Sequence, residues 1–146
     1  MTAKQKGNYT ELRCLAACIE NGYEVSIPYG ENSHYDFIID VEGSLIRIQA
    51  KTATLKKGTQ DAIIFQCRSM HRNATGITHT SYSSENVDYF ATFWKDKVYL
   101  VPVEECSTSK TLRLNSYTGS QNKLMNFAED YELKKQLQKI KEKNKK

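Results

Sequence analysis

The fold is decided by residues 35–51, YDFIIDVEGSLIRIQAK. Two apolar runs flank a Glu-Gly-Ser turn signal at 42–44, a pattern that predicts a β-hairpin. Side chains alternate along an extended strand, so Gln49 and Lys51 project from one face while the apolar residues beside them project from the other. The returning strand can bring Asp36 to the same surface. An acid, an amide oxygen and an ammonium group placed together outline a site for Mg²⁺ and phosphate.

The segment before the hairpin is expected to be a helix over residues 8–22, because apolar residues recur there at helical spacing. The apolar stripe consists of Leu12, Leu15, Ala16 and Ile19. Asn8 or Thr10 is expected to cap the start of the helix, and Gly22 to end it in the left-handed conformation. The stripe predicts which helix face is buried.

The remaining sequence predicts more strands and a second helix. The expected strands span residues 24–28, 62–67, 88–94, 97–103 and, as a short extended piece, 111–114. The pair joined by Lys95-Asp96 has continuous apolar runs, which indicates strands buried on both faces. Residues 68–82 are polar and basic without a clear period, so we expect a loop with at most a short strand near Ile77. A closing helix is expected from about Gln121, with an interruption near Asp130.

The composition favours one compact domain. The chain has 146 residues, of which 39% are hydrophobic, enough for a core in a single unit over residues 1–133. Residues 134–146 carry seven lysines against one glutamate, and we expect them to form a basic helical tail. The net charge of the chain is +4, so the rest of the protein is slightly acidic. DNA binding must therefore depend on local basic patches.

The sequence also predicts where the protein works. No stretch reaches the length of a membrane span, and the first residues lack the apolar run of a signal peptide. The four cysteines are scattered and lack the spacing of a zinc site. We therefore expect a soluble cytoplasmic protein without membrane contact, whose thiols are reduced.

Three features follow one another in the chain: a helix carrying Glu11, a hairpin carrying Asp36, and the motif Gln49-X-Lys51. In this order they resemble the PD-(D/E)XK nuclease superfamily, and most closely the small homing endonucleases encoded by bacterial group I introns. The phrases that carry the resemblance are Tyr35–Ile39, Ile48–Thr52, Asp88–Ala91 and Val98–Pro102. The resemblance implies an α/β fold with a restriction-endonuclease-like core, in which N-terminal and C-terminal helices flank a central mixed sheet.

The resemblance also implies a catalytic set of Glu11, Asp36, Gln49 and Lys51. Asp36, Gln49 and the main-chain carbonyl of Ala50 would ligate Mg²⁺, with Mn²⁺ as a substitute, and Glu11 would join directly or through water. Lys51 would position or help to deprotonate the attacking water. One metal ion or two are both compatible with this set.

Two positions depart from the superfamily pattern. Tyr35 stands where the motif has proline, and Gln49 stands where it usually has a second carboxylate. An amide still offers a carbonyl oxygen to a cation but removes one negative charge, so we expect weaker metal binding than with glutamate. Asp40 shares the face of Asp36 by parity, and we expect it to be a structural or secondary acid. Taken alone, Asp36 also suits a turn cap and Lys51 an exposed strand lysine; their joint order favours the nuclease site.

Basic residues around this site are candidates for contact with double-stranded DNA. They are Arg47, Lys56, Lys57, Arg68, His71, Arg72 and His79. The expected function is Mg²⁺-dependent, site-specific endonuclease cleavage of DNA in intron homing. A homodimer or homotetramer is expected, because one site cuts one strand. The alternatives are a Holliday-junction resolvase, a restriction-type nuclease of the same fold, or an inactive DNA-binding module.

Overall fold

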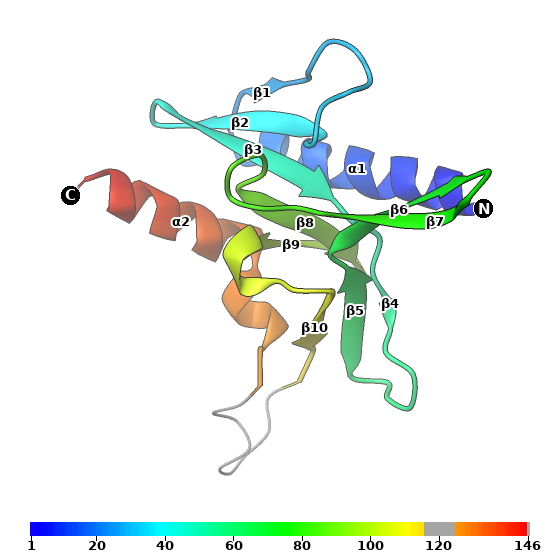
Figure 1. Cartoon of the computed structure of the whole chain (residues 1–146). Helices are drawn as coiled ribbons and strands as arrows, with labels where there is room; N and C mark the ends of the chain where they lie inside the picture. Colours follow the sequence, from blue (N-terminus) through cyan, green and yellow to red (C-terminus); the bar gives the residue numbers. More distant parts are fainter. Residues whose placement is uncertain (116–124, 146) are drawn as a thin grey trace.

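A five-stranded mixed sheet forms the centre of the molecule (Figure 1). The computed structural model describes residues 1–115 and 125–145, with side chains throughout except at residues 70–72. The sheet has the order β1 (Val25–Ser26), β2 (Phe37–Val41), β3 (Ser44–Ala50), β8 (Tyr89–Trp94) and β9 (Lys97–Pro102). The β3–β8 pair is parallel and the other pairs are antiparallel. The predicted hairpin and the predicted α/β class are confirmed.

Two layers cover the central sheet. Helices α1 (Ala3–Glu20) and α2 (Leu133–Asn144) pack on one face, where Ile39, Ile48 and Leu100 are fully buried. A small sheet of β10 (Ser109–Arg113), β5 (Ala62–Gln66) and β4 (Thr54–Leu55) packs on the other face. The hairpin of β8 and β9 therefore lies between two hydrophobic layers, as its continuous apolar sequence predicts. Neither helix in the described ranges has the length and apolar character that a membrane crossing requires.

Helix α1 begins earlier than predicted, and the face that it packs on the sheet overlaps the predicted stripe at Leu15 but not at Leu12 or Ile19. Its cap is Thr2, whose hydroxyl accepts the Gln5 N–H while the Gln5 side chain accepts the Thr2 N–H; this capping box replaces the expected cap at Asn8 or Thr10. The residues that α1 buries are Thr10, Cys14 and Cys18. Leu12 and Ile19 of the expected stripe are 63% and 55% exposed. The prediction is wrong for these two residues because a narrow seam of small side chains, spaced four residues apart, packs on the sheet, with Leu15 beside it.

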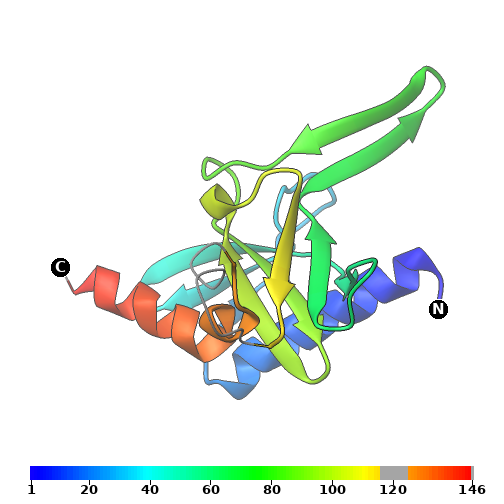
Figure 2. The same cartoon turned by 90° about the horizontal axis from the view of Figure 1, so that it is seen from below.

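The second correction concerns residues 68–82. The predicted short strand near Ile77 is present, but in place of the predicted loop the chain forms a two-stranded hairpin of β6 (Arg68–Asn73) and β7 (Gly76–Ser81). Figure 2 shows this hairpin projecting away from the body of the protein. Its turn is held by the Asn73 side chain, which accepts the N–H and the hydroxyl of Thr75. Most of β7 is exposed, so no burial pattern marks the strands in the sequence.

The end of the chain belongs to the packed body. A 3₁₀ turn at Ala128–Tyr131 precedes α2, which buries Leu133, Leu137 and Ile140 against the sheet. This turn explains the interruption that the sequence predicts near Asp130. The predicted start of this helix at Gln121 lies outside the described residues. The lysines of α2 are carried by a helix whose apolar side is part of the core.

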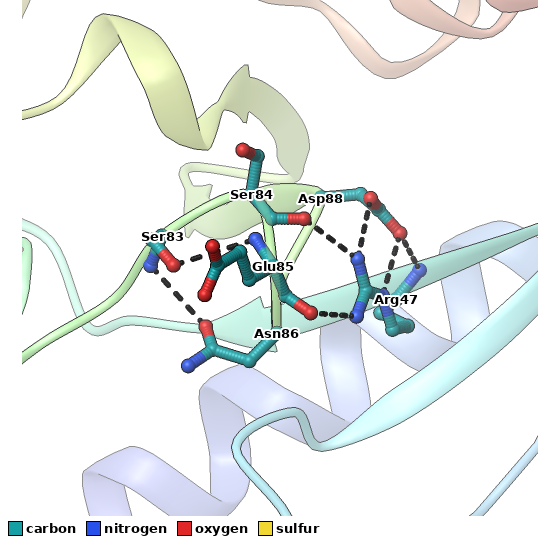
Figure 3. A network of polar contacts seen from close by, with 6 residues as sticks. All are labelled: Arg47, Ser83, Ser84, Glu85, Asn86 and Asp88. Carbon is teal, nitrogen blue, oxygen red and sulfur yellow. Dashed lines mark hydrogen bonds and ion pairs between the residues drawn. The ribbon is translucent and has the colours of Figure 1, made fainter.

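An ion pair fixes the first half of β3 to the segment that leads into β8. The Arg47 Nε and Nη2 donate to the two carboxylate oxygens of Asp88 at 3.0 Å each. Arg47 also donates to the main-chain carbonyls of Glu85 at 2.7 Å and Ser84 at 2.9 Å (Figure 3). The Asp88 carboxylate accepts the Arg47 main-chain N–H as well, at 2.8 Å. This clamp sets the entry of the parallel strand β8.

Replacing Arg47 with methionine is expected to lower the free energy of unfolding by about 1–3 kcal/mol, because Asp88 stays partly buried and loses its charged partner. Chemical denaturation at pH 7 measures this difference. Lys97→Met is the matched control: it removes the solvent-exposed pair with Glu132 and is expected to destabilise the protein much less than Arg47→Met. Equal losses in the two variants would contradict a special role for the clamp.

The same pair predicts a pH dependence. Partial burial raises the pKa of Asp88, but the hydrogen bonds and charge of Arg47 outweigh it, so the pKa lies below its usual value. The stabilisation is therefore complete above the unfolded pKa of about 4 and is lost as the pH falls through the folded value. The stability difference between wild type and Arg47→Met should shrink in that acidic range.

Candidate active site

Asp36 immediately precedes β2 and lies beside the end of β3 that carries Gln49. Its main-chain N–H donates to the Ile48 carbonyl at 2.8 Å. Its side-chain Oδ2 accepts the Ala50 N–H, also at 2.8 Å. These two partners flank Gln49 in the sequence, so Asp36 bonds on both sides of it. The register of the hairpin thus holds the Asp36 carboxylate against the main chain of β3 at the position of Gln49.

Glu11 approaches the same place from helix α1. The half-buried position of Glu11 raises the pKa of its carboxyl, and the negative charge of Asp36 raises it further. The two carboxylates are therefore close enough to repel each other. Thr10, beside Glu11, forms a 3.3 Å hydroxyl contact with Thr52, which follows β3 by two residues. This contact joins α1 to the chain that carries the other site residues.

The Asp36 carboxyl also has a raised pKa. Burial raises it, while the Ala50 N–H and the positive charge of Lys51 lower it without cancelling the effect of burial. Both acids at this edge of the sheet consequently resist ionisation. A site with two such carboxylates favours binding of a cation, whose positive charge would stabilise their ionised forms.

Lys51 has a fixed main chain at the end of β3. Its N–H donates to the Ala91 carbonyl at 2.8 Å, and its carbonyl accepts the Thr92 hydroxyl at 2.6 Å. Thr92 is fully buried in β8. The parallel pairing of β3 with β8 therefore determines where the lysine side chain leaves the sheet, and its charge reaches Asp36.

The donors at this site fit a hard divalent cation. Glu11, Asp36 and Gln49 all offer oxygen, which Mg²⁺ and Mn²⁺ prefer over nitrogen or sulfur. Within residues 1–115 and 125–145, no three His, Cys, Asp or Glu side chains gather closely enough to hold a metal. This agrees with the sequence, because an amide replaces the third acid. Asp40 has a structural role, since its Oδ1 accepts the Gly43 N–H of the hairpin turn at 2.8 Å.

The candidate DNA contacts are distributed over several elements. Arg47 uses four of its five guanidinium N–H groups inside the chain, so its main role is structural. Lys56 and Lys57 lie in the turn between β4 and β5, and Lys57 is exposed. Arg68 is at the base of the projecting hairpin and His79 is exposed on its second strand. His71 and Arg72 lie in β6, but their side chains are outside the described part.

Sequence reasoning missed the residues that hold the site in place. Thr10, Thr52 and Thr92 provide hydroxyl contacts, and Tyr82 lies against Lys51. Threonine is common in strands for its shape alone, so nothing in the sequence marked these hydroxyls. The spacing of Thr10 with Cys14 and Cys18 on the helix was the available signal for the buried seam.

Asp36→Asn is expected to stabilise the metal-free protein. The asparagine keeps an oxygen that accepts the Ala50 N–H but removes the charge that repels Glu11. At pH 8 the free energy of unfolding should rise by up to about 1 kcal/mol in buffer with a chelator. In wild type, the raised pKa of folded Asp36 gives stability below the unfolded pKa, and this stability is lost as the pH rises through the folded value. The gain from the asparagine should therefore vanish towards pH 4, where Asp36 is protonated. Thermal unfolding from pH 4 to 8 measures this, and a less stable variant at pH 8 would contradict it.

Comparisons with known proteins show the family of the chain and a solved structure of the same fold. Residues 1–134 match the family described as PD-(D/E)XK endonuclease. A solved structure, that of the bacterial homing endonuclease I-Ssp6803I, superposes with a TM-score of 0.79. The alignment covers 99% of this chain and 97% of that one, at 19% identity, and shows a common fold. No curated protein sequence matches the chain. The chain belongs to the PD-(D/E)XK endonuclease family.

Proposed function

We propose that the protein is a Mg²⁺-dependent endonuclease that cuts double-stranded DNA at a specific site, with Mn²⁺ as a substitute cofactor. The observation that carries the proposal is the meeting of Glu11, Asp36 and Lys51 at one edge of the sheet, where each charge affects its neighbour. Cleavage of a phosphodiester needs a cation, a positioned water and stabilisation of negative charge. These residues supply the groups for all three.

Each residue would have a defined role in cleavage. Asp36 and the Gln49 carbonyl oxygen would hold the cation, with the Ala50 carbonyl and Glu11 completing the oxygen ligands. The bound cation would supply Lewis acidity to the scissile phosphate. The Lys51 Nζ would orient the attacking water by hydrogen bonding and offset the charge that develops on the phosphoryl oxygens. Two hydrogen bonds fix the Lys51 main chain, so the side chain that carries the ammonium starts from a defined position.

The projecting hairpin would provide contacts with DNA. A two-stranded β-ribbon fits the major groove, and β6–β7 stands clear of the body (Figure 2). Residues 68–81 include two arginines and two histidines but no acid, which suits a phosphate-lined groove. Lys56 and Lys57, in the β4–β5 turn, would add phosphate contacts.

The proposal includes a role in intron homing and an assembly of two or four copies. A solved structure that matches over 99% of this chain is that of a bacterial homing endonuclease, which supports the same role here. One site cuts one strand, so cleavage of both strands requires two copies in a homodimer or homotetramer. The exposed Leu12 and Ile19 on α1 offer an apolar face to a second copy. Branched DNA would be the substrate instead if the protein were a resolvase.

Cleavage assays test the proposal. Two supercoiled plasmids serve as substrates. The first carries the two DNA sequences that flank the coding sequence and its intron, joined directly to each other. The second carries a four-way junction. With Mg²⁺, wild type is expected to nick and linearise the first plasmid. Asp36→Ala and Lys51→Ala are expected to cut at least about 100-fold more slowly, because each removes a group that acts on the reacting phosphate. DNA binding in Ca²⁺ should persist.

Lys4→Ala, which removes an exposed lysine on α1, is the control and should cut like wild type. If the wild-type protein binds the first plasmid but cuts no DNA with Mg²⁺ or Mn²⁺, the protein is a binding module. Preferential cutting of the junction would identify a resolvase.

Arg68→Ala and His79→Ala are expected to weaken DNA binding about 3- to 10-fold if the hairpin enters the groove. The slope of log affinity against log salt should fall by about one unit for Arg68→Ala, because one phosphate contact is lost. Fluorescence anisotropy at several salt concentrations measures both effects. Lys143→Ala, at the exposed end of α2, is the control. An unchanged affinity in both hairpin variants would exclude this surface.

A further inference from the structure

Tyr82 connects the projecting hairpin with the candidate active site. It follows the last residue of β7, at the base of the hairpin. Its ring stands edge-to-face against Phe90 of β8, with 5.4 Å between the ring centroids and an interplanar angle of 90°. Phe90 is buried in the core. The ring of Tyr82 is thus fixed by packing, and its hydroxyl has a defined position.

The hydroxyl of Tyr82 faces the head group of Lys51. The Lys51 Nζ donates a long hydrogen bond of 3.4 Å to the Tyr82 Oη. The same ammonium lies 4.8 Å from the centroid of the tyrosine ring, within the range of a cation–π contact. Two contacts of different kinds therefore restrict a side chain that otherwise has four rotatable bonds.

The other partner of the Tyr82 hydroxyl is Ser69, the second residue of β6. The two hydroxyl oxygens are hydrogen-bonded across the base of the hairpin. Because the Lys51 ammonium donates to the Tyr82 oxygen, the phenolic proton is free to point to the Ser69 oxygen. Ser69, Tyr82 and Lys51 thereby form a chain from both hairpin strands to the site.

We infer that Tyr82 is a positioning residue for Lys51, and that Ser69 and Tyr82 transmit the placement of the hairpin to the lysine. A hairpin seated on DNA would fix Ser69 and Tyr82, and with them the ammonium beside the phosphate. A hairpin that is not seated would leave the lysine less restricted. Binding of the correct site would in this way favour cleavage as well as affinity. The inference rests on the proposed nuclease function.

Single-turnover cleavage separates this role from packing. Tyr82→Phe keeps the ring on Phe90 but removes the hydroxyl, so the cleavage rate constant is expected to fall about tenfold. The affinity for DNA in Ca²⁺ and the melting temperature should remain close to wild type. Ser69→Ala should lower the rate in the same direction, and Ser69→Thr, which keeps a hydroxyl, should restore it. Tyr29→Phe, at a fully exposed tyrosine, is the control.

A wild-type cleavage rate in both Tyr82→Phe and Ser69→Ala would overturn the inference. A rate loss matched by an equal loss of affinity would also overturn it, because the hydroxyls would then serve binding alone. A second measurement does not depend on cleavage: the rate at which an amine-reactive reagent labels Lys51, followed by mass spectrometry. Tyr82→Phe should label several-fold faster than wild type, with Lys57 as the internal reference. Unchanged labelling would overturn the positioning role even if wild type cuts DNA, whereas a wild type that cuts nothing refutes the nuclease proposal itself.

Discussion

The site depends on the hydrogen bond by which the Ala50 N–H reaches the side chain of Asp36. In a regular sheet this N–H of β3 would bond to a neighbouring strand, but here it donates to a carboxylate. This bond, together with the Asp36 N–H on the Ile48 carbonyl, fixes the acid against the β3 main chain on both sides of Gln49. A shift of one residue in the hairpin register would send Gln49 to the opposite face and disperse the group. The register of one hairpin thus decides whether the proposed site can form.

The middle of β3 and its end have opposite energetic characters. In the middle, Arg47 and Asp88 form a bidentate pair that stabilises the fold and orients β8. At the end, burial raises the pKa of both Glu11 and Asp36, and the charge of Asp36 raises the pKa of Glu11 further. The parallel pairing of β3 with β8 starts beside the ion pair and runs to Ala50. Stability gained at the ion pair supports an arrangement that costs stability at the end of the strand, as expected where charges are gathered for chemistry.

The sequence predicts the parts of the structure that have a burial pattern. The hairpin of β2 and β3 and that of β8 and β9 alternate or run apolar because they pack on a core. The hairpin of β6 and β7 has no such pattern, since solvent surrounds most of it, and the prediction of a loop there is wrong. The predicted buried face of α1 is right at Leu15 and wrong at Leu12 and Ile19, which are exposed. Cys14 and Cys18 are buried against the sheet, whereas the larger Leu12 is exposed. The spacing of apolar residues in the sequence does not show how closely a helix packs on a sheet.

For the site, the sequence supplies the order of Glu11, Asp36, Gln49 and Lys51 but not the contacts that hold them. Those contacts come from Thr92, Tyr82 and a main-chain N–H, whose roles depend on tertiary structure. The most direct test of the central claim is thermal unfolding during titration with Mg²⁺. The account predicts that Mg²⁺ raises the melting temperature of wild type, that Gln49→Glu responds at lower concentration, and that Asp36→Asn does not respond. Identical curves for all three proteins would contradict a cation site formed by these side chains.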